Sequence, residues 1–556
     1  MKTLSCCMVL AATAVTITSV SEAATRRCVL PAEGLPSSEE TIASAWKGEN
    51  ASFPCYNSVA EAVRNSESGD VIVLAPGTHN ITETINVDKE NLQIRNASWS
   101  NLYTPVTRES VVLNGNGLVP LMMATMKSVK ISDLTFVNGY TNAVDGASAI
   151  CFPNSKSDLA ISNCVFRGNN SAGSCVKVYV SARLNISDCV FSNNVQTVSS
   201  GTSHGVALNI TSGSSWGEAS YGTIWNCTFK DNTATASQVQ GGVVYVKDGR
   251  VRMEECSFVS NTVSQTGTSA LQGHMLCVGA NATIANCTFT GSIPANNNYY
   301  AYGSALNLQG EGCVVSNCTF SAIEEKQSSK SKYGVIYIKG SSAKVIGCRV
   351  TDNTIYSSAV LFVENAGDVL VRNCLFARNS RENASARMIR LSGASVSSAI
   401  GIMVENCTFA DNTDTIAPIQ FQDIAYDNYL VNSVFTTDDI LNTDLTTASV
   451  LASNCCFTAL QSVGGLSFGG RCIAVTRGNH KFIDAANGDY HLEMRSPLRE
   501  KGMMLEWMTA DAKDLDGNPR VVSRFCLPRG EDSFAMPDIG CYECMIRVPA
   551  FMIIVR

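Results

Sequence analysis

One hydrophobic pattern recurs along the chain, in the order aliphatic-x-Asn-Cys-x-Phe. The first clear copy runs from Ile161 to Phe166. Equivalent copies occupy 224–229, 284–289, 315–320, 371–376 and 404–409, and looser ones occupy 186–191, 253–258, 345–350, 431–435 and 454–457. Ten intervals separate Cys164 from Cys455, so the mean period is about 29 residues. A repeat of this length indicates stacked structural units rather than several separate domains.

Each repeat contains two or three short stretches with strand character. A Phe-x-x-Asn motif follows the first pattern, as at Phe166/Asn169, and a β-rich run precedes it, as at 242–247 and 334–339. These stretches are rich in Val, Ile, Phe and Tyr, alternate with period two, and are separated by Gly, Asn and Ser. One repeat cannot bury its own apolar face, but stacked repeats can. The pattern therefore predicts an all-β solenoid in which each repeat is one coil.

The Asn, Cys and Phe of the repeat each have an expected place in the coil. Asn tolerates the left-handed backbone that is needed where one strand bends into the next. Stacked Asn amides can also hydrogen-bond along the solenoid axis. After the bend, Cys and Phe occupy alternate positions and point inward together. A small Cys beside a large Phe would fill a narrow interior.

These repeats resemble the right-handed parallel β-helix superfamily, the fold of pectate lyases and many surface proteins. The N-terminal part is similar to the cap of such solenoids, with a short amphipathic helix over 59–64 and a first strand within 69–78. The Phe-x-x-Asn copies and Gly241-Gly242-Val243 also resemble the passenger repeats of chlamydial polymorphic outer membrane proteins. The resemblance implies a right-handed parallel β-helix (solenoid) with a short N-terminal capping helix and a C-terminal cap module.

The composition changes after about residue 470. Motifs at 487–492, 514–520 and 538–543 resemble, in order and spacing, the C-terminal module of bacterial β-helix proteins called choice-of-anchor Q. This resemblance implies secretion and an anchor. Asp514, Asp516 and Asn518 offer oxygen ligands for a Ca²⁺ site, but they lack the Gly and Glu that complete an EF-hand loop. A turn is the competing prediction, and we assign no metal.

The overall composition excludes two classes of protein. The formal net charge is −7, only 16% of the residues are charged and 45% are hydrophobic. The charge is too low and the apolar share too high for a disordered chain. Because there is no basic excess, we expect no nucleic acid among the partners.

Residues 1–23 have the features of a secretory signal peptide, with small residues before the expected cleavage at Ala24. No later stretch is long and apolar enough to span a membrane, so we expect no transmembrane segment in the mature chain. We expect 24–110 to form the N-terminal cap and first coils, 111–470 the β-helix repeats, and 471–556 the C-terminal cap module. The expected location is secreted, extracellular or at a bacterial cell surface.

Secretion and the 23 cysteines together suggest a disulfide framework, but stacking argues against it. Neighbouring coils lie about 4.8 Å apart, and stacked cysteines have parallel Cβ vectors that fit the dihedral angle of a disulfide poorly. We expect the repeat cysteines from Cys164 to Cys407 to form a buried ladder of mostly free thiols. The disulfide candidates lie outside it: Cys28 with Cys55, Cys455 or Cys456 with Cys472, and Cys526 with Cys541 or Cys544.

Period-two alternation also predicts which side chains face outward. It places pairs such as Val176/Val178 and Ile336/Ile338 inside and their neighbours outside. The outward column of aromatic, amide and cationic residues is a candidate glycan-binding strip: Lys177, Tyr179, Tyr245, Lys247, Asn307, Tyr337, Lys339 and Arg390. Tyr rings can pack against sugar rings, and Lys and Arg can pair with uronate or sulfate groups. A solvated sheet face without a ligand is the alternative interpretation.

Catalysis needs more than this column. Elimination from a uronide needs a base and a cation or Ca²⁺ at the carboxylate, and glycoside hydrolysis needs two flanking carboxylates. No acidic cluster accompanies the lysines in the sequence, so the catalytic residues stay unassigned. The sequence favours a secreted or cell-surface protein that is adhesin-like or glycan-binding, acts without catalysis and needs no cofactor.

Two other functions stay open. One is a polysaccharide lyase or glycoside hydrolase that acts on acidic polysaccharide, with Ca²⁺ as cofactor if it is a lyase. The other is a structural spacer of the cell envelope. The expected partner in the first two functions is a polysaccharide or surface glycan, and the oligomeric state stays open.

Overall fold

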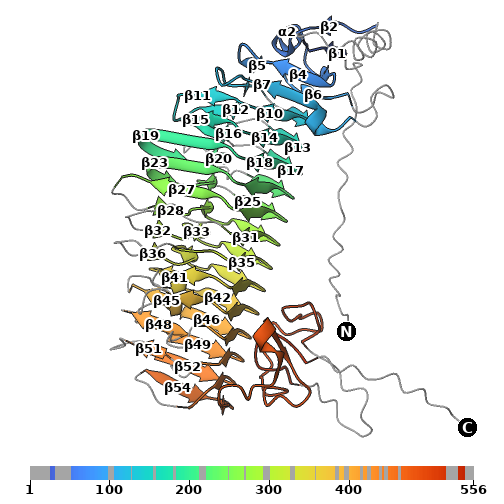
Figure 1. Ribbon diagram of the computed structural model, residues 1–556. Coiled ribbons are helices and arrows are strands. Elements are labelled where there is room, and N and C mark those ends of the chain that lie inside the picture. Colours follow the sequence, from blue (N-terminus) through green and yellow to red (C-terminus); the bar gives the residue numbers. More distant parts are fainter. Residues whose placement is uncertain are drawn as a thin grey trace, which may run out of the picture.

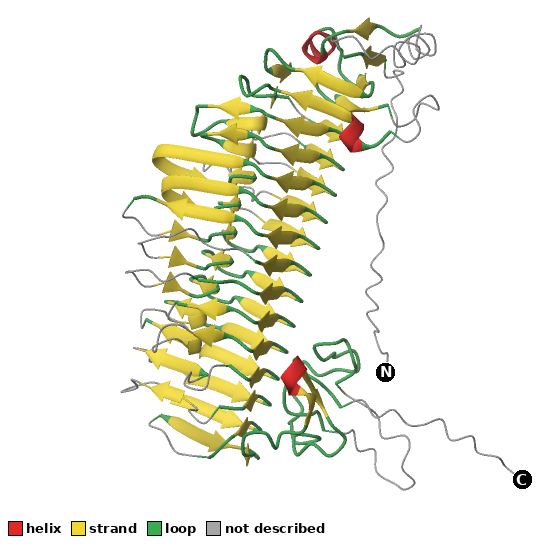
Figure 2. Ribbon diagram, in the orientation of Figure 1, coloured by secondary structure: helices red, strands yellow, loops and turns green. Residues whose placement is uncertain are grey.

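The chain forms one elongated parallel β-helix, as the repeat predicts (Figures 1 and 2). The computed structural model describes residues 25–31, 52–97, 106–126, 128–153, 158–179, 183–211, 221–247, 250–267, 271–291, 301–325, 332–356, 359–381, 387–393, 400–412, 418–422, 427–437, 441–443, 449–460, 465–520 and 536–544. The predicted signal peptide, residues 1–23, lies outside these ranges.

The strands of a coil contribute to the sheets in a fixed order. In one central coil, β21 (Tyr221–Trp225) belongs to sheet A, β22 (Thr228–Lys230) to sheet B, β23 (Thr233–Gln240) to sheet D and β24 (Val244–Val246) to sheet C. Each strand pairs in parallel with its counterparts in the neighbouring coils. The sheets therefore run along the solenoid axis, and residues at the same position of successive repeats form columns.

The remaining strands follow the same scheme. Sheet A also contains β1 (Arg26–Val29), β2 (Cys55–Tyr56), β3 (Val71–Leu74), β6 (Gln93–Asn96), β9 (Val129–Ser132), β13 (Leu159–Ser162), β17 (Arg183–Ser187), β25 (Arg250–Glu254), β30 (Thr283–Ala285), β34 (Val314–Ser316), β38 (Lys344–Ile346), β42 (Val369–Arg372), β46 (Ile400–Glu405), β49 (Asp427–Val431), β52 (Ser449–Ser453) and β54 (Leu466–Gly469). Sheet B also contains β4 (Gly77–Asn80), β7 (Val111–Asn114), β10 (Thr135–Val137), β14 (Val165–Arg167), β18 (Val190–Ser192), β26 (Ser257–Val259), β31 (Thr288–Thr290), β35 (Thr319–Ser321), β39 (Arg349–Thr351), β43 (Leu375–Ala377), β47 (Thr408–Ala410), β50 (Val434–Phe435), β53 (Cys456–Phe457) and β55 (Ile473–Ala474).

The third face of the solenoid has two sheets. Sheet C also contains β5 (Ile85–Val87), β8 (Met122–Ala124), β12 (Ala147–Phe152), β16 (Ser174–Tyr179), β20 (Leu208–Thr211), β29 (Leu276–Val278), β33 (Leu306–Leu308), β37 (Ile336–Ile338), β41 (Ala359–Glu364), β45 (Arg387–Ser392), β48 (Ile419–Gln422) and β51 (Leu441–Thr443). Sheet D also contains β11 (Tyr140–Thr141), β15 (Asn170–Ser171), β19 (Val195–His204), β27 (Thr262–Gln265), β28 (Leu271–Gln272), β32 (Ala301–Tyr302) and β36 (Lys332–Tyr333). A small additional pair joins β40 (Thr354–Ile355) and β44 (Ser380–Arg381).

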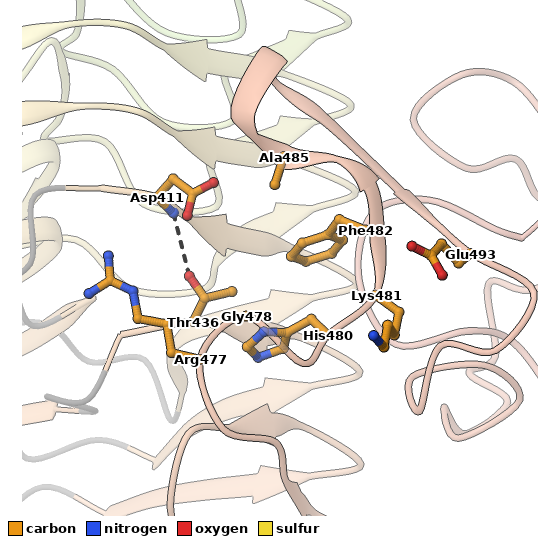
Figure 3. A pocket seen from close by; sticks show the side chains of 9 residues that line it. All are labelled: Asp411, Thr436, Arg477, Gly478, His480, Lys481, Phe482, Ala485 and Glu493. Carbon is orange, nitrogen blue, oxygen red and sulfur yellow. Dashed lines mark hydrogen bonds between the residues drawn. The ribbon is translucent and has the colours of Figure 1, made fainter.

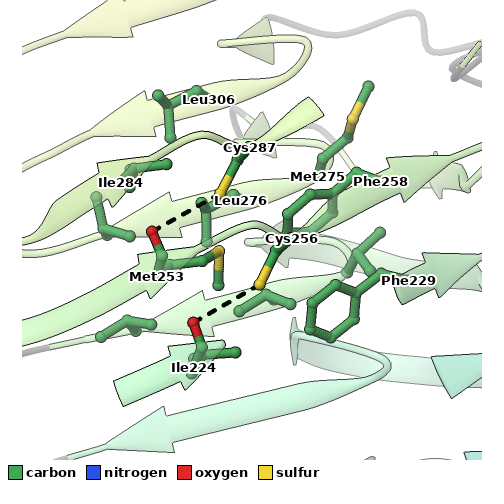
Figure 4. Close-up of a cluster of buried hydrophobic side chains, with 14 of the residues drawn as sticks. Ile224, Phe229, Met253, Cys256, Phe258, Met275, Leu276, Ile284, Cys287 and Leu306 are labelled. Carbon is green, nitrogen blue, oxygen red and sulfur yellow. Dashed lines mark hydrogen bonds between the residues drawn. The ribbon is translucent and has the colours of Figure 1, made fainter. Parts of the chain in front are cut away.

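The interior is filled by columns of stacked side chains. Phe229, Phe258 and Phe289 stack with ring centroids 4.8 Å apart, and both Cys256 and Cys287 point into the same core (Figure 4). Each thiol donates to a carbonyl of the preceding coil, as Cys256 Sγ does to Ile224 O at 3.7 Å. The predicted inward placement of Cys and Phe is confirmed.

The Asn residues occupy two different columns. Asn before Cys sits at the corner between sheets A and B with a positive φ, 49° at Asn163 and at Asn226, as predicted. The buried amide ladder, however, is built from the Phe-x-x-Asn residues. The Asn194 Nδ2 donates to the Asn232 Oδ1 at 2.9 Å, and the Asn232 Nδ2 donates to the Asn261 Oδ1 at 3.0 Å. The corner asparagines instead reach neighbouring corners, as Asn226 does to Asp188.

Two different structures flank the solenoid. The helix α2 (Val59–Arg64) is capped by the Ser58 side chain and buries Val59 and Val63 in the first coils; a 3-10 turn, η1 (Arg108–Ser110), precedes β7. The C-terminal module contains the antiparallel pair β56 (Phe482–Asp484) and β57 (Asp489–Leu492), joined by η2 (Ala485–Asn487). Figure 1 shows it beside the last coils, on the sheet B side.

The C-terminal module contacts both apolar and polar residues of sheet B, among them Thr408, whose hydroxyl accepts from the Cys541 N–H. Leu375, Ala377 and Ala410 point outward from sheet B and pack against Tyr490 and Tyr542 of the module. Earlier coils carry both polar and apolar residues at these outward positions, such as Thr228 and Lys230 in one coil and Val137 and Val165 in others. The module therefore covers three apolar outward residues on two adjacent strands of sheet B.

Candidate functional site

The predicted strip lies on the outer side of sheet C. Val176 and Val178 point into the core, as predicted, and so do their counterparts in the other coils. Lys177, Asn209 and Tyr245 occupy the intervening position on successive strands. The alternation of inward and outward positions was therefore predicted correctly.

The prediction that this column is an accessible strip is wrong for four of its eight members, which are buried. Lys177 is 2% exposed, Tyr245 9%, Asn307 0% and Tyr337 2%. Tyr179 and Arg390 are half-buried, whereas Lys247 and Lys339 are exposed. The cause is sheet D, which lies over the outer side of sheet C.

Aromatic contacts show how sheet D covers the column. The ring of His204, at the end of β19, lies 4.8 Å from that of Tyr245, and the ring of Tyr302 on β32 lies 4.8 Å from that of Tyr337. Within sheet D, Ala234, Ala236 and neighbouring residues form a small core of their own. The segment between sheets B and C thus folds as an extra layer rather than as an open loop.

Polar members of the column are paired within the protein. The Lys177 Nζ donates to the Asp145 Oδ1 at 3.1 Å and lies 4.7 Å from the centre of the Tyr179 ring. The Tyr337 hydroxyl donates to Glu364. Burial and this carboxylate raise the pKa of Tyr337, so its hydroxyl stays protonated. These contacts pair Lys177 and Tyr337 with groups of the protein itself.

An exposed aromatic and cationic surface lies instead on sheet A. We call it the sheet A strip: Arg183, Asn185, Trp225, Arg250 and Arg252, on the consecutive strands β17, β21 and β25. Their neighbours along the strands, Leu184, Ile186, Ile224, Val251 and Met253, point into the core. Because those inward residues are fixed by packing, the outward side chains project from a rigid, flat support.

The strip combines a ring face with cationic side chains. Trp225 is 39% exposed, and the Arg252 side chain is 61% exposed while its Nη2 contacts the Glu254 Oε1 at 2.5 Å. Arg183, Arg250 and Arg252 stand close together although the chain as a whole has a net charge of −7. An indole face can pack on a sugar ring, and guanidinium groups bind carboxylates and sulfates through paired hydrogen bonds.

Sequence reasoning missed this strip because it considered the outward residues of the β-rich run alone. The signal was present in Arg250-Val-Arg-Met-Glu254, where Arg alternates with buried apolar residues. A comparison of the outward columns of all the sheets would have found it.

The calcium candidate is a turn. The Asp514 Oδ1 accepts hydrogen bonds from the backbone N–H groups of Asp516 and Asn518, at 2.9 and 2.7 Å. Asp516 faces away, toward His491 and Arg349. The three side chains do not converge on one point, and no cluster of three or more His, Cys, Asp or Glu suited to a metal occurs in the described ranges.

The cysteines are unbridged throughout the described part of the chain. The predicted pairs Cys28–Cys55 and Cys456–Cys472 are not formed in this structure, and Cys541 and Cys544 also carry free thiols. Cys28 and Cys55 are register partners on neighbouring parallel strands, where the Cβ vectors fit a disulfide poorly. Cys526 lies outside the described residues.

The fold and the repeats define the class of protein. A family profile described as "Right handed beta helix region" matches residues 78–289 and 274–483. These two matches together span most of the chain, which therefore belongs to this family of right-handed parallel β-helix proteins.

Solved structures of polysaccharide-acting proteins are similar to this chain. One is the A-module of the mannuronan C-5 epimerase AlgE6 of Azotobacter vinelandii, with 11% identity, a TM-score of 0.32, and 75% of this chain and 96% of that chain covered. Another is a mannuronic acid specific family 6 polysaccharide lyase from human gut microbiota, with 11% identity, a TM-score of 0.28, and coverage of 80% and 92%. A third is the pectate lyase Pel9A, with 11% identity, a TM-score of 0.26, and coverage of 94% and 97%. No curated protein matches this sequence. Within the described residues, no helix has the length and apolar character needed to cross a membrane.

Proposed function

We propose that this chain is a secreted or surface-displayed β-helix protein that binds an acidic polysaccharide across the sheet A strip without catalysing its cleavage. The observation that carries this proposal is the exposed Trp225 on β21 with the exposed Arg252 diagonally across on the adjoining strand β25, where Glu254 is the register partner of Trp225. The proposed ligand, an acidic glycan, is the one predicted from the sequence. The proposed binding surface is the sheet A strip instead of the outward column of sheet C.

A parallel β-helix suits a linear ligand. Successive strands lie about 4.8 Å apart, so a polymer laid along the axis meets equivalent positions of several coils in turn. Trp225 would pack on one sugar ring, and Arg252, which lies diagonally across the adjoining strand, would pair with an acidic group of a neighbouring sugar. Arg183 and Arg250 share the register of Tyr221, further along the same face, and would meet another part of the polymer. Because the charges are exposed, binding should weaken as salt is added.

The location belongs to the same proposal. Residues 1–23 would direct export as a signal peptide, and 24–110 and 111–470 would form the cap and the solenoid that displays the strip. Residues 471–556 would act as the choice-of-anchor Q-like module that holds the protein at a bacterial cell surface. The docking of this module beside the last coils leaves the sheet A strip on a distant part of the solenoid (Figure 1).

Binding can be tested by affinity electrophoresis and calorimetry with polygalacturonate, alginate, a sulfated glycan and neutral dextran. We expect the acidic polymers to bind and dextran not to bind. Trp225→Ala and Arg252→Gln should each weaken binding roughly tenfold or more. Matched controls are Tyr140→Ala, an exposed aromatic on sheet D, and Arg167→Gln, an exposed cation on sheet B. Equal losses in the controls, or no binding to any acidic polymer, would contradict the strip as the site.

The alternative function, a polysaccharide lyase, can be tested by a separate activity measurement. Incubation with the same uronate polymers, followed by absorbance of unsaturated products with and without Ca²⁺, measures lyase activity. We expect no product, because Lys177 is buried against Asp145 and Tyr179 rather than open to a polymer. Product formation would overturn the non-catalytic part of the proposal while leaving binding to be judged separately.

A further inference from the structure

The direct neighbours of Trp225 on the outer side of sheet A are an acid and two hydroxyl residues. Its register partner on β25 is Glu254, and its register partner on β17 is Ser187. Thr223 is the outward residue two positions before it on its own strand. A sugar ring packed on Trp225 therefore lies beside one carboxylate and two hydroxyl groups, and beside no cation among these neighbours.

Glu254 is held at this position by Arg252. The Arg252 Nη2 donates to the Glu254 Oε1 at 2.5 Å. The Glu254 side chain is 21% exposed and that of Arg252 is 61% exposed, so both can meet a ligand. The alternate residues Val251 and Met253 point into the core and fix the strand beneath the pair. The carboxylate is thus a fixed part of the surface beside the indole.

The cations of the sheet A strip lie toward the other end of the strands. Arg252 precedes Glu254 by two residues and Arg250 precedes it by four, which corresponds to about 6.6 Å and about 13 Å along β25. Arg183 and Arg250 are the register partners of Tyr221 on its two sides. An acidic group on the sugar above the indole would face Glu254, whereas an acidic group on the next sugar can reach Arg252.

We infer that the strip selects acidic polysaccharides in which neutral and acidic sugars alternate, and that Glu254 determines this selection. The inference rests on the proposed function. The hydroxyl groups of a neutral ring on Trp225 donate to the Glu254 carboxylate in charge-assisted hydrogen bonds, and the adjoining acidic sugar pairs with Arg252. In a homopolymer of uronates every ring carries a carboxylate, so the ring on Trp225 meets a like charge at Glu254.

Charge density alone predicts the opposite preference. A homopolymer of uronates carries an acid on every sugar, and an alternating polymer carries one on every second sugar. A surface that recognises only negative charge therefore binds the homopolymer more tightly. Tighter binding of the alternating polymer is a result that the arginines of the strip do not explain by themselves.

Calorimetry of the full-length protein tests the selection with two probes. Hyaluronan alternates glucuronate with neutral N-acetylglucosamine, and polygalacturonate carries an acid on every sugar. We expect hyaluronan to bind roughly fivefold more tightly per acidic group. Glu254→Gln keeps the shape and removes the charge, so binding of polygalacturonate should strengthen, binding of hyaluronan should weaken, and the ratio of the two affinities should change roughly tenfold. The gain with polygalacturonate should shrink at high salt, which screens exposed charges.

Two matched controls separate a local contact from a change in net charge. Glu255→Gln makes the same change at the exposed corner residue that follows Glu254. Glu493→Gln makes it at an exposed residue beside the surface hollow between the C-terminal module and the solenoid (Figure 3). Neither substitution should change the ratio of hyaluronan to polygalacturonate affinity.

Three results would overturn the inference. One is binding of polygalacturonate to the wild type as tight as that of hyaluronan, or tighter. The second is an unchanged ratio in Glu254→Gln, and the third is an equal change of the ratio in Glu254→Gln and Glu255→Gln. Each of these leaves the proposed function standing if Trp225→Ala and Arg252→Gln still weaken the binding of an acidic polymer. Absence of binding to every acidic polymer would contradict the proposed function, and the inference with it.

Discussion

Arg520 of the C-terminal module binds Asn373, a corner residue of the solenoid, with two hydrogen bonds. Its Nε and Nη2 donate to the Asn373 Oδ1 at 3.1 and 2.8 Å. The same guanidinium contacts the Glu543 Oε1 through Nη1 at 2.6 Å and the Gly540 carbonyl through Nη2 at 3.0 Å. Arg520 is buried, so the link between module and solenoid is a desolvated guanidinium with four hydrogen bonds.

Replacing Arg520 by Met should release the module. The variant keeps the volume but leaves the Glu543 carboxylate and the Asn373 amide oxygen buried without their donor. Removal of one partner of a buried ion pair costs about 3–5 kcal/mol. We expect faster proteolysis within 471–520 and an earlier unfolding transition in urea, with the repeat region unchanged by circular dichroism. Arg495→Met, at an exposed position, is the control; equal proteolysis of the two variants would contradict the clamp.

His491 should make the docking of the module depend on pH. Its Nδ1 lies 2.5 Å from the Asp489 Oδ1 and its Nε2 lies 2.6 Å from the Asp516 Oδ2. Its ring lies 4.1 Å from that of Tyr542, at an angle of 31°. Asp516 also pairs with Arg349 of the solenoid. Burial acts to lower the pKa of His491, but the hydrogen bonds to Asp489 and Asp516 outweigh it, and the net shift is upward.

The direction of the pH effect follows from that shift. A histidine with a raised pKa in the folded state adds stability that is complete below its unfolded pKa of about 6.5 and is lost as pH rises through the folded value. We expect the unfolding temperature of the module to fall between pH 6 and pH 8 in the wild type. In His491→Gln this fall should be smaller. An identical slope in both proteins would show that other groups dominate.

The solenoid was predictable because its signals are local and repeated. Asn226 bends the chain with a φ of 49°. Phe229 follows two residues after the next Cys, and its ring stacks on the equivalent Phe rings of the neighbouring coils. Both features return in every clear copy of the motif, so the period, the strand order within a coil and the filling of the core could all be inferred from the residues alone.

The surfaces were less predictable because they depend on segments without a repeated motif. The segment that contains β19 carries no copy of the pattern, yet it covers Tyr245 through His204. Alternation shows which side of a strand a residue occupies, but it does not show what lies above that side. The apolar outward residues Leu375 and Ala410 were the available signal for the docked module, since outward positions of a solvated sheet are usually polar.

Replacement of Asn232 tests how much the hydrogen bonds of the buried amide ladder contribute to the stability of the solenoid. Its Nδ2 donates to the Phe191 carbonyl at 2.9 Å and to Asn261, while its Oδ1 accepts from the backbone and side chain of Asn194. Asn232→Ala leaves several of these buried groups unpaired, and we expect a loss of roughly 3 kcal/mol or more in urea unfolding. Asn142→Ala, at an exposed site, should change stability by less than about 0.5 kcal/mol. Similar losses in the two variants would contradict a role for the ladder.

The cysteines should divide into two kinetic classes. Cys55 is exposed, whereas Cys189, Cys348 and Cys374 are buried in the ladder and burial raises the pKa of each thiol well above its usual value. Because the thiolate is the reactive form, native protein should show a small fast phase with a thiol reagent at pH 8 and a much larger one after unfolding without reductant. Cys55→Ser should reduce the fast phase; an unchanged fast phase would indicate that Cys55 is bridged to Cys28 after all. Fewer than about five reactive thiols in the unfolded, unreduced protein would refute the free-thiol ladder, since the cysteines from Cys164 to Cys407 would then be joined to one another.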